Sequence, residues 1–301
     1  MGFHGQSGTI KFRAFYNAAQ METPTNSLPL NGVRIVSLCI NTPGPVAASR
    51  LQRLGAHVIK IEPPSGDPLK AFAPDWYQSL AKDQVVHTLD LKAPAARAEF
   101  DELLSGADLL LASFRPSAMK RLGLDWDSVH ARHPKLCFVG IVGYPAPMEE
   151  KSGHDLTYLA SAGLVTPPEL PATLFADLAA AERCVSQALA LLLKFARTGE
   201  AGCDFVSLAE CASELAAPIN AGLTVRGSVL GGGSPFYGLY QATDGWIAVA
   251  ALEPRFAERL LLEFNLPQAD HSEFARIFRQ RSAMAWETWS AERDLPIVAV
   301  R

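Results

Sequence analysis

The sequence predicts an α/β fold, with a large doubly wound, Rossmann-like domain built on a parallel sheet and a smaller α+β domain after it. Apolar, β-branched runs alternate with helical segments along most of the chain, as in folds built from βαβ units. From about residue 229 the pattern changes to a glycine-rich loop and two short apolar runs joined by "TDG". The first apolar run is followed by "NTPGP" and not by GxGxxG, so a nicotinamide or flavin dinucleotide is not expected.

The first elements define the parallel sheet. "VRIVSLCI" (33–40) is typical of a strand buried on both faces. "TPGPVAASRLQRLGA" (42–56) predicts a turn and a helix ending near Gly55, and "HVIKIEPP" (57–64) predicts a second strand. Strand, helix and strand in succession predict a βαβ unit and therefore a parallel sheet. The alternation continues with helices at 97–107 and 126–134 and strands at 108–114 and 136–144.

The remaining elements lead into the smaller domain. An apolar helix is predicted at 178–199, and a short strand followed by a helix at 202–217. We place a boundary near residue 222. It gives an irregular N-terminal tail (1–28), a large α/β domain (29–222) and a small α+β domain (223–301). In the small domain the "TDG" turn predicts an antiparallel hairpin, followed by helices at 254–263 and 272–292 and a last strand in "PIVAV".

Composition and charge exclude several classes of protein. Of the 301 residues 49% are hydrophobic and 19% charged, which is typical of globular domains, and the net charge is −4. This charge gives no electrostatic reason to expect nucleic acid or an anionic membrane as a partner. The first 28 residues lack the long apolar stretch of a signal peptide, and "VSQALALLLKF" is too short to span a bilayer. We expect a cytoplasmic protein.

Neither cysteine nor histidine spacing indicates a metal site. The five cysteines form no CxxC motif and are odd in number, which favours buried, reduced thiols. His130 and His133 of "HARH" are spaced as metal ligands can be, but no carboxylate or cysteine cluster accompanies them in the sequence.

Four positions suit chemistry, although each also has a structural interpretation. Asp177 precedes an apolar helix, so it is either an N-cap or a carboxylate at a helix start that Ala179, Ala180 and Ala181 leave open to a ligand. His154 and Asp155 of "SGHDLTYLASAG" either open a helix or carry chemistry, and Glu253 before Pro254 is another helix-start carboxylate. "GGGS" (231–234) is either a flexible loop or a cradle for a phosphate or pantetheine group.

Several sequence blocks together resemble the class III CoA-transferase family, the group of carnitine-CoA and formyl-CoA transferases, and within it most closely the α-methylacyl-CoA racemases. The resemblance runs from about Leu28 to Val300. It depends on "PLNGVRIVSL", "PGPVAASRLQRLGAHVIKIEPPSGDP", "TLDLKAP", "ADLLLASFRP", "RLGLDW", "HPKLCFVGIVGY", "GHDLTYLA", "FADLAAA" and "LGGGSPFYGLYQATDGWIAVAALEP".

The resemblance implies roles for these residues. Asp177 matches the central catalytic carboxylate, which is a nucleophile in transferases and one of two bases in racemases. His154 matches the second base, oriented by Glu253, and Asp155 supports the thioester end. Coenzyme A is implied as part of the substrate and not as a permanently bound cofactor. Its contacts would come from the large domain, the tyrosine of the "GHD" block and the glycine loop: Pro63, Asp67, Arg115, Tyr158, Gly231, Gly232 and Gly233. A surface ion pair is the alternative for Arg115.

The chemistry agrees with this assignment. The α-hydrogen of a thioester is a very weak acid, so its removal needs a positioned base and a stabilised enolate oxygen. Inversion also needs an acid on the opposite face, and histidine suits both roles because it titrates near neutrality.

The sequence departs from the family pattern in three stretches. "ADLAAA" stands where glycine-rich "GDFGGG" is usual, and each methyl group narrows the approach to Asp177. "LAKDQVVHT" replaces a basic segment, and the acidic "APMEEKSG" replaces a "GQxGP" loop. A homodimer is expected, with interlocking of the two chains left open because this chain ends at Arg301 where relatives continue. Three functions therefore stay open: racemase, CoA-transferase, or a non-catalytic CoA-binding member.

Overall fold

The computed structural model describes residues 28–301, so the predicted tail lies outside the described residues except for Leu28. The strands of the larger sheet are β1 (Arg34–Ser37), β2 (His57–Glu62), β3 (Val85–Thr88), β4 (Leu109–Ala112), β5 (Cys137–Val142) and β6 (Cys203–Ser207). The helices along this part of the chain are α1 (Pro43–Arg53), α2 (Leu69–Phe72), α3 (Pro74–Ala81), α4 (Pro94–Ser105), α5 (Pro116–Arg121), α6 (Trp126–Arg132), α7 (Asp155–Ser161), α8 (Phe175–Thr198), α9 (Leu208–Leu215) and α10 (Ala217–Asn220).

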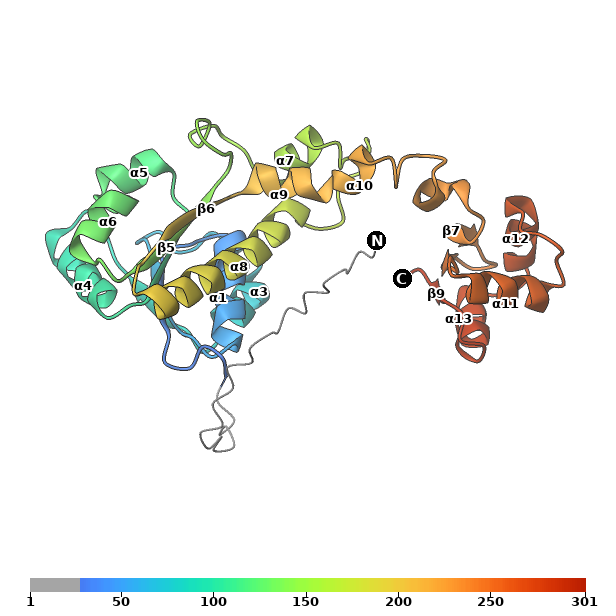
Figure 1. Cartoon of the computed structure of the whole chain (residues 1–301), viewed down its shortest axis with the longest axis horizontal. Helices are drawn as coiled ribbons and strands as arrows, with labels where there is room; N and C mark the ends of the chain where they lie inside the picture. The colour runs from blue at the N-terminus through green and yellow to red at the C-terminus, as the bar shows by residue number, and fades with distance from the viewer. Residues whose placement is uncertain (1–27) are drawn as a thin grey trace, which may run out of the picture. The chain divides into compact units, whose positions relative to one another are not determined.

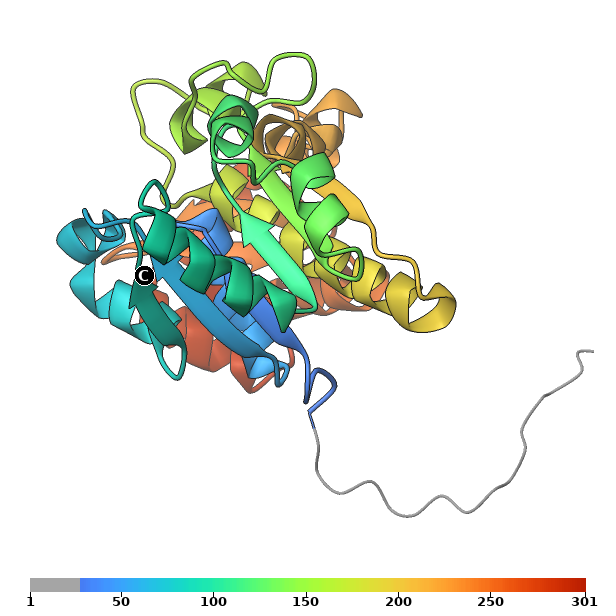
Figure 2. The same ribbon diagram turned by 90° about the vertical axis from the view of Figure 1, so that its left-hand side faces the viewer.

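The six strands form one parallel sheet in the order β3-β2-β1-β4-β5-β6, the doubly wound order. Val36 of β1 lies opposite Ile59 of β2 and Leu110 of β4, and both pairings are parallel. Helices α4 and α6 lie on one side of the sheet and α1 on the other (Figure 1), and Figure 2 shows α4 in front of the strands. Because helices cover both faces, the central strands are continuous apolar runs. The predicted fold class is confirmed.

Strand β3 was not predicted, and its burial explains why. It pairs in parallel with β2, with Ile59 opposite Val85. Val85 and Val86 are 44% and 40% exposed, so this edge strand has neither the buried run nor the clean alternation that marks a strand in the sequence.

The described chain divides into two compact units. Residues up to Ser113 form the first unit together with Leu122–Val139 and Gln187–Cys203, and the second consists of Phe114–Arg121, Gly140–Ser186 and Asp204–Arg301. This division follows contacts in space and not the order of the chain. The predicted boundary near residue 222 stays a prediction.

A buried ionic cluster holds the loop after β2 in the first unit. The Lys60 ammonium lies 2.5 Å from Asp67 Oδ2 and 3.1 Å from Glu62 Oε1, and all three residues are at most 3% exposed. Asp67 Oδ1 also accepts the backbone N–H groups of Asn41 and Leu69 at 3.0 and 2.9 Å. Although burial opposes it, hydrogen bonds from Lys70, Tyr77 and Lys60 lower the pKa of Glu62.

Replacing Asp67 with alanine is expected to lower the free energy of unfolding by about 3 kcal/mol, because the buried Lys60 ammonium loses one of its two carboxylate partners and two backbone amides lose their acceptor. Urea unfolding followed by circular dichroism measures this loss. Asp75 is exposed in the first turn of α3 and provides the control. Asp75→Ala is expected to cost less than about 1 kcal/mol. Equal losses in the two variants would show that the cluster does not stabilise the fold.

The second sheet belongs to the C-terminal part of the second unit. Its elements are β7 (Tyr237–Gln241), β8 (Trp246–Ala250) and β9 (Ile297–Ala299), with helices α11 (Pro254–Phe264), α12 (His271–Phe278) and α13 (Ala283–Ala291). The strands have the order β7-β8-β9 and both pairings are antiparallel, so the predicted hairpin and last strand are confirmed. Tyr240, Ile247, Phe274, Phe278 and Trp286 belong to the core between this sheet and its helices.

The prediction of one helix over 272–292 is wrong. The structure has α12 and α13 with a break between them, because Ser282 adopts an extended N-cap conformation and its hydroxyl accepts the Ala285 N–H at 3.2 Å. A serine cap inside an apolar, helix-favouring segment is a weak signal in a sequence.

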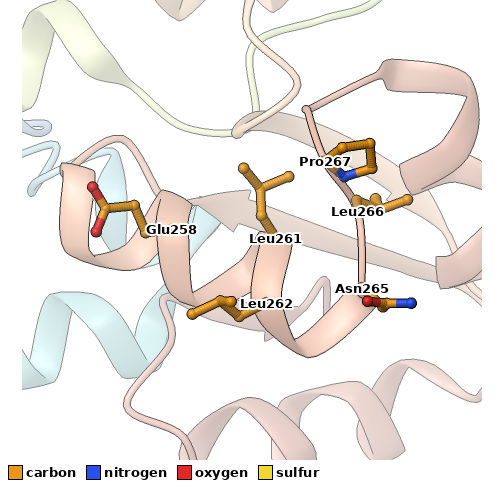
Figure 3. A pocket seen from close by; sticks show the side chains of 6 residues that line it. All are labelled: Glu258, Leu261, Leu262, Asn265, Leu266 and Pro267. Carbon is orange, nitrogen blue, oxygen red and sulfur yellow. The ribbon is translucent and has the colours of Figure 1, made fainter.

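An open, partly apolar pocket of about 530 Å³ lies at the C-terminal end of α11. Figure 3 shows its lining, with Leu261 and Leu262 on the helix and Leu266 and Pro267 on the chain that follows. None of the residues that the sequence analysis assigned to a site lines this pocket.

Among the residues described here, no helix is long and apolar enough to cross a membrane. All five cysteines are free thiols, and all except Cys203 are buried.

Candidate active site

His154 occupies the N-cap position of α7 and its side chain is exposed. Its backbone N–H donates to Thr157 Oγ1 at 3.0 Å, and the Thr157 hydroxyl donates to the His154 carbonyl oxygen at 2.8 Å. These bonds close the start of the helix and use only the backbone of His154. The imidazole is therefore presented at a fixed helix start and can be reached by a ligand.

Asp155, the first residue of α7, links this helix to α8. Its side chain is buried, with 7% of the residue exposed, and Oδ1 accepts the backbone N–H of Asp177 at 3.0 Å. The first N–H groups of a helix have no partner within the helix, so this carboxylate satisfies one of them at the start of α8. Asp155 thus does not cap its own helix, which was one of the alternatives, but binds the backbone of the candidate catalytic residue.

Asp177 is not the N-cap of α8, contrary to one reading of the sequence. The helix begins at Phe175, and the Leu178 N–H already donates to the Leu174 carbonyl oxygen at 3.0 Å. Asp177 therefore lies in the first turn, half-buried, where the positive end of the helix dipole favours a carboxylate.

The alanines after Asp177 differ in their exposure. Ala180 and Ala181 are fully buried, and only Ala179 is partly exposed. Ala180 and Ala181 follow Asp177 at the i+3 and i+4 positions, so they lie on the same face of α8 as Asp177, and their methyl groups pack into the core there. That the three alanines leave the helix start open to a ligand stays a prediction. The narrowing of the approach to Asp177 by these methyl groups stays a prediction.

Tyr158 and Arg115 lie in the same unit. Tyr158 is buried one turn after Asp155, and its ring packs edge-to-face on Tyr144 with centroids 5.2 Å apart. Arg115 is exposed, and its guanidinium donates to Ser152 Oγ at 3.0 Å. This partner is a hydroxyl and not the carboxylate of a surface ion pair. A contact of Arg115 with a coenzyme A phosphate stays a prediction.

Sequence reasoning missed the anchors of the loop before His154. Glu150 accepts the backbone N–H and the hydroxyl of Ser117 at 2.7 and 2.9 Å, and these bonds lower the pKa of its carboxyl group. Ser152 fixes the other side of the loop through Arg115. In the sequence, the acidic "APMEEKSG" stretch shows only a departure from the family pattern. Its partner, Ser117, is far away in the sequence and gave no signal.

The remaining predicted residues of the second unit are Glu253 and the glycines at 231–233. Glu253 is exposed at the N-cap of α11, without a side-chain cap hydrogen bond. Its pairing with His154 stays a prediction. The N–H groups of Gly231 and Gly233 donate to the Ser228 carbonyl at 3.0 and 2.7 Å, so these amides serve the loop itself. Gly232 has φ +86°, which favours glycine. A coenzyme A contact by this loop stays a prediction.

Pro63 and Asp67 belong to the first unit. Asp67 is the buried partner of Lys60 described above, and the Pro63 carbonyl accepts the Gly66 N–H at 2.8 Å. These contacts stabilise the loop, and coenzyme A binding by either residue stays a prediction.

Histidines and acids do not gather into a metal centre in the described chain, where no group of three or more such ligands lies together. His130 stacks on Trp126, with ring centroids 4.5 Å apart. His133 Nε2 lies 3.9 Å from Asp101 Oδ1, and burial lowers the pKa of its imidazole.

Comparison with known proteins identifies relatives along nearly the whole chain. The chain is 26% identical to the "Probable fatty acyl-CoA transferase Rv3272" of Mycobacterium tuberculosis, over 93% of this chain and 79% of that protein. It is 27% identical to the alpha-methylacyl-CoA racemase of Homo sapiens, over 86% of this chain and 74% of that protein. It is 30% identical to the alpha subunit of the succinyl-CoA–L-malate CoA-transferase of Chloroflexus aurantiacus, over 87% and 68%.

Solved structures agree on the fold. The crystal structure of Rv3272 from Mycobacterium tuberculosis matches with a TM-score of 0.80 at 24% identity, covering 91% of this chain and 86% of that one. A CAIB/BAIF family protein from Brucella suis matches with a TM-score of 0.75 at 21% identity, covering 91% and 84%. The model of CoA-transferase family III matches residues 30–295. The chain therefore belongs to CoA-transferase family III, whose members process acyl-CoA thioesters as racemases or CoA-transferases.

Proposed function

We propose that this protein inverts the α-carbon of 2-methylacyl-CoA thioesters by proton transfer through an enolate. The observation that supports it is the hydrogen bond from the Asp177 N–H to Asp155 Oδ1, which joins the start of α8 to the start of α7. Because His154 immediately precedes Asp155, this bond ties a carboxylate and an imidazole to one local framework. Two such groups are what a reaction with a base on each face of the α-carbon requires.

In the proposed reaction, one proton leaves the α-carbon on one face and another is delivered to it on the opposite face. Ionised Asp177 removes the α-proton, the electron pair of the C–H bond moves into the thioester to form an enolate, and protonated His154 delivers a proton to the opposite face. In the reverse direction neutral His154 removes the proton and protonated Asp177 returns one. Glu253 would stabilise the imidazolium if it reaches His154. The place of Asp177 in the first turn of α8 favours a carboxylate, because the positive end of the helix dipole lies there.

The second candidate function is CoA transfer between carboxylic acids. Here the Asp177 carboxylate attacks the thioester carbonyl, expels the thiolate of coenzyme A and forms a mixed anhydride. The thiolate then attacks the aspartyl carbonyl of the anhydride, which releases the donor acid as its carboxylate and leaves an aspartyl-CoA thioester. The acceptor carboxylate attacks this thioester to form a second anhydride and expels the thiolate, which attacks the acceptor's carbonyl to give the new acyl-CoA and free Asp177. The resemblance to two relatives named as transferases favours this reaction. It needs Asp177 but no second base.

Incubation with a 2-methylacyl-CoA in D2O tests the proposal, and mass spectrometry follows incorporation of deuterium at the α-carbon. We expect one deuterium per acyl group and loss of optical purity at a matching rate. If coenzyme A binds and no deuterium enters, the racemase proposal fails, and assays with carboxylic acid acceptors decide between a transferase and a non-catalytic member of the family.

A further inference from the structure

The glycine segment (residues 228–235) is closed by its own hydrogen bonds. The Ser228 carbonyl accepts the N–H groups of Gly231 and Gly233, and the Gly231 carbonyl accepts the Gly227 N–H at 2.9 Å. A side chain at Gly231 or Gly233 would collide with nearby backbone carbonyl groups, so this compact turn requires glycine. Because these bonds are internal, the attachment of the segment to the rest of the unit depends on the residues at its two ends.

Tyr240 ties the C-terminal end of this segment to the core of the small sheet. It is 5% exposed, and its ring packs against Phe274 and Phe278 of α12, with centroids 6.1 and 5.1 Å apart. From this fixed position its hydroxyl group donates a hydrogen bond to the Pro235 carbonyl oxygen at 2.6 Å. Proline has no backbone N–H, so this carbonyl is the polar group through which residue 235 can be held.

His271 is a second neighbour of the same hydroxyl group. It occupies the first position of α12, and its Nδ1 lies 3.2 Å from Tyr240 Oη. A hydroxyl group has one proton, and the Pro235 carbonyl can only accept. Both bonds can therefore exist together only when Nδ1 carries a proton and donates it to Oη. The imidazolium always has this proton, whereas a neutral imidazole with its proton on Nε2 presents Nδ1 as a competing acceptor.

The proton that decides between these arrangements is the one on His271. Histidine is the side chain that changes its charge near neutral pH, and two other ionisable groups face this one. Burial and the Asp270 carboxylate raise the pKa of Tyr240 to about 12, so the phenol keeps its proton. Hydrogen bonds from Ser272 and from the Glu273 N–H lower the pKa of Asp270, the N-cap of α12, so its carboxyl group stays ionised. A change of pH near neutrality thus acts on the bonds of Tyr240 through the imidazole.

We propose that His271, Tyr240 and Pro235 form a proton-dependent latch on the glycine segment. With His271 protonated, Nδ1 donates to Oη and the phenol proton is committed to the Pro235 carbonyl, which holds the segment against the core. When the imidazole loses its proton, Nδ1 competes for the phenol proton and the bond to Pro235 is weakened. The inference goes beyond the proposed function, because it concerns the mobility of this segment in the free protein and not the reaction.

Hydrogen–deuterium exchange of the free protein, followed by mass spectrometry, tests the latch. Deuterium uptake in peptides that cover residues 228–237, corrected for the intrinsic exchange rate at each pH, gives their protection from pH 5 to pH 8, a range on the order of the one in which histidine titrates. We expect protection in the unchanged protein to fall about fivefold as the pH rises across the titration of His271, on the order of one hydrogen bond. NMR of ¹⁵N-labelled histidine gives the midpoint of that titration, with His271→Ala identifying its resonances.

Two variants are expected to change protection in opposite directions. Tyr240→Phe removes the donor and keeps the ring, so protection should be low at every pH. His271→Ala removes the competing acceptor and leaves the phenol proton to Pro235, so protection should be high at every pH. Tyr237→Phe is the matched control, since it removes a hydroxyl group from the same strand and should keep the pH dependence.

Protection that does not change with pH in the unchanged protein would overturn the proposal, and so would a pH dependence that persists in His271→Ala. The same loss of protection in Tyr237→Phe would also overturn it, because any missing hydroxyl group on β7 would then have the effect. If Tyr240→Phe does not fold, His271→Ala decides by itself, because His271 is exposed. The measurement uses no substrate, so failure of the D2O assay with acyl-CoA would contradict the proposed function alone.

Discussion

Replacing Asp177 with asparagine is expected to lower the rate of α-proton exchange by about a thousandfold or more, as loss of a general base does. Asparagine has nearly the same shape and keeps the backbone N–H that Asp155 accepts, so the link between α7 and α8 should persist. An amide, however, can neither accept the α-proton nor attack a thioester. Deuterium incorporation from D2O, measured under saturating substrate, gives the size of the loss.

The control for this variant is Asp127→Asn. Asp127 is an exposed acid in the first turn of α6, so the same chemical change is made at a helix start that belongs to no candidate site. It should leave exchange unchanged. If the exchange rate of Asp177→Asn stays within about tenfold of the rate of the unchanged protein, another group is the base. A general base contributes at least about a hundredfold to the rate.

Replacing His154 with alanine is expected to separate the two candidate reactions. Proton return to the second face requires an acid there, so racemisation should fall by a hundredfold or more, on the order of a general acid's contribution. CoA transfer through Asp177 should survive. The start of α7 should also survive, because Thr157 closes it through the backbone of His154. Chiral analysis of the acyl group and a transfer assay with carboxylic acid acceptors measure the two activities on the same preparation.

His57→Ala is the matching control, since His57 is an exposed histidine at the start of β2. Inversion at the normal rate in His154→Ala would contradict the two-base scheme. Loss of both activities together, with helix content intact by circular dichroism, would instead mean that the imidazole is needed before the two reactions diverge.

The sequence predicted the framework well where local signals are strong. The β1–α1–β2 unit follows from an apolar run, prolines at the start of a helix and the glycine after its end, all within one short stretch. It predicted poorly where burial or capping is unusual. Strand β3 is too exposed to show a pattern, and Ser282 divides a segment that otherwise favours one helix.

In the candidate site, too, some features could be predicted from the sequence and others could not. His154, Asp155 and Asp177 could be chosen from the sequence, because polar residues at helix starts stand out against the apolar runs beside them. Their relation could not. The hydrogen bond between Asp155 and Asp177 joins residues that are 22 positions apart. The Tyr158 hydroxyl lies against Gly143 and Gly153, and Gly143 is well separated from Tyr158 in the sequence. Such contacts depend on tertiary packing, which periodicity does not record.

The hydrogen bond between Asp155 and Asp177 also affects which changes of sequence the connection between α7 and α8 can tolerate. Since the spacing of the two helix starts is held by a carboxylate and an amide, the connection 162–174 does not have to hold it. That connection is mostly exposed, and Leu170 within it is 75% exposed. Changes of length or composition there need not disturb the positions of His154 and Asp177 at the two helix starts. A lineage can therefore alter this segment while keeping the hydrogen bond that joins the two helix starts.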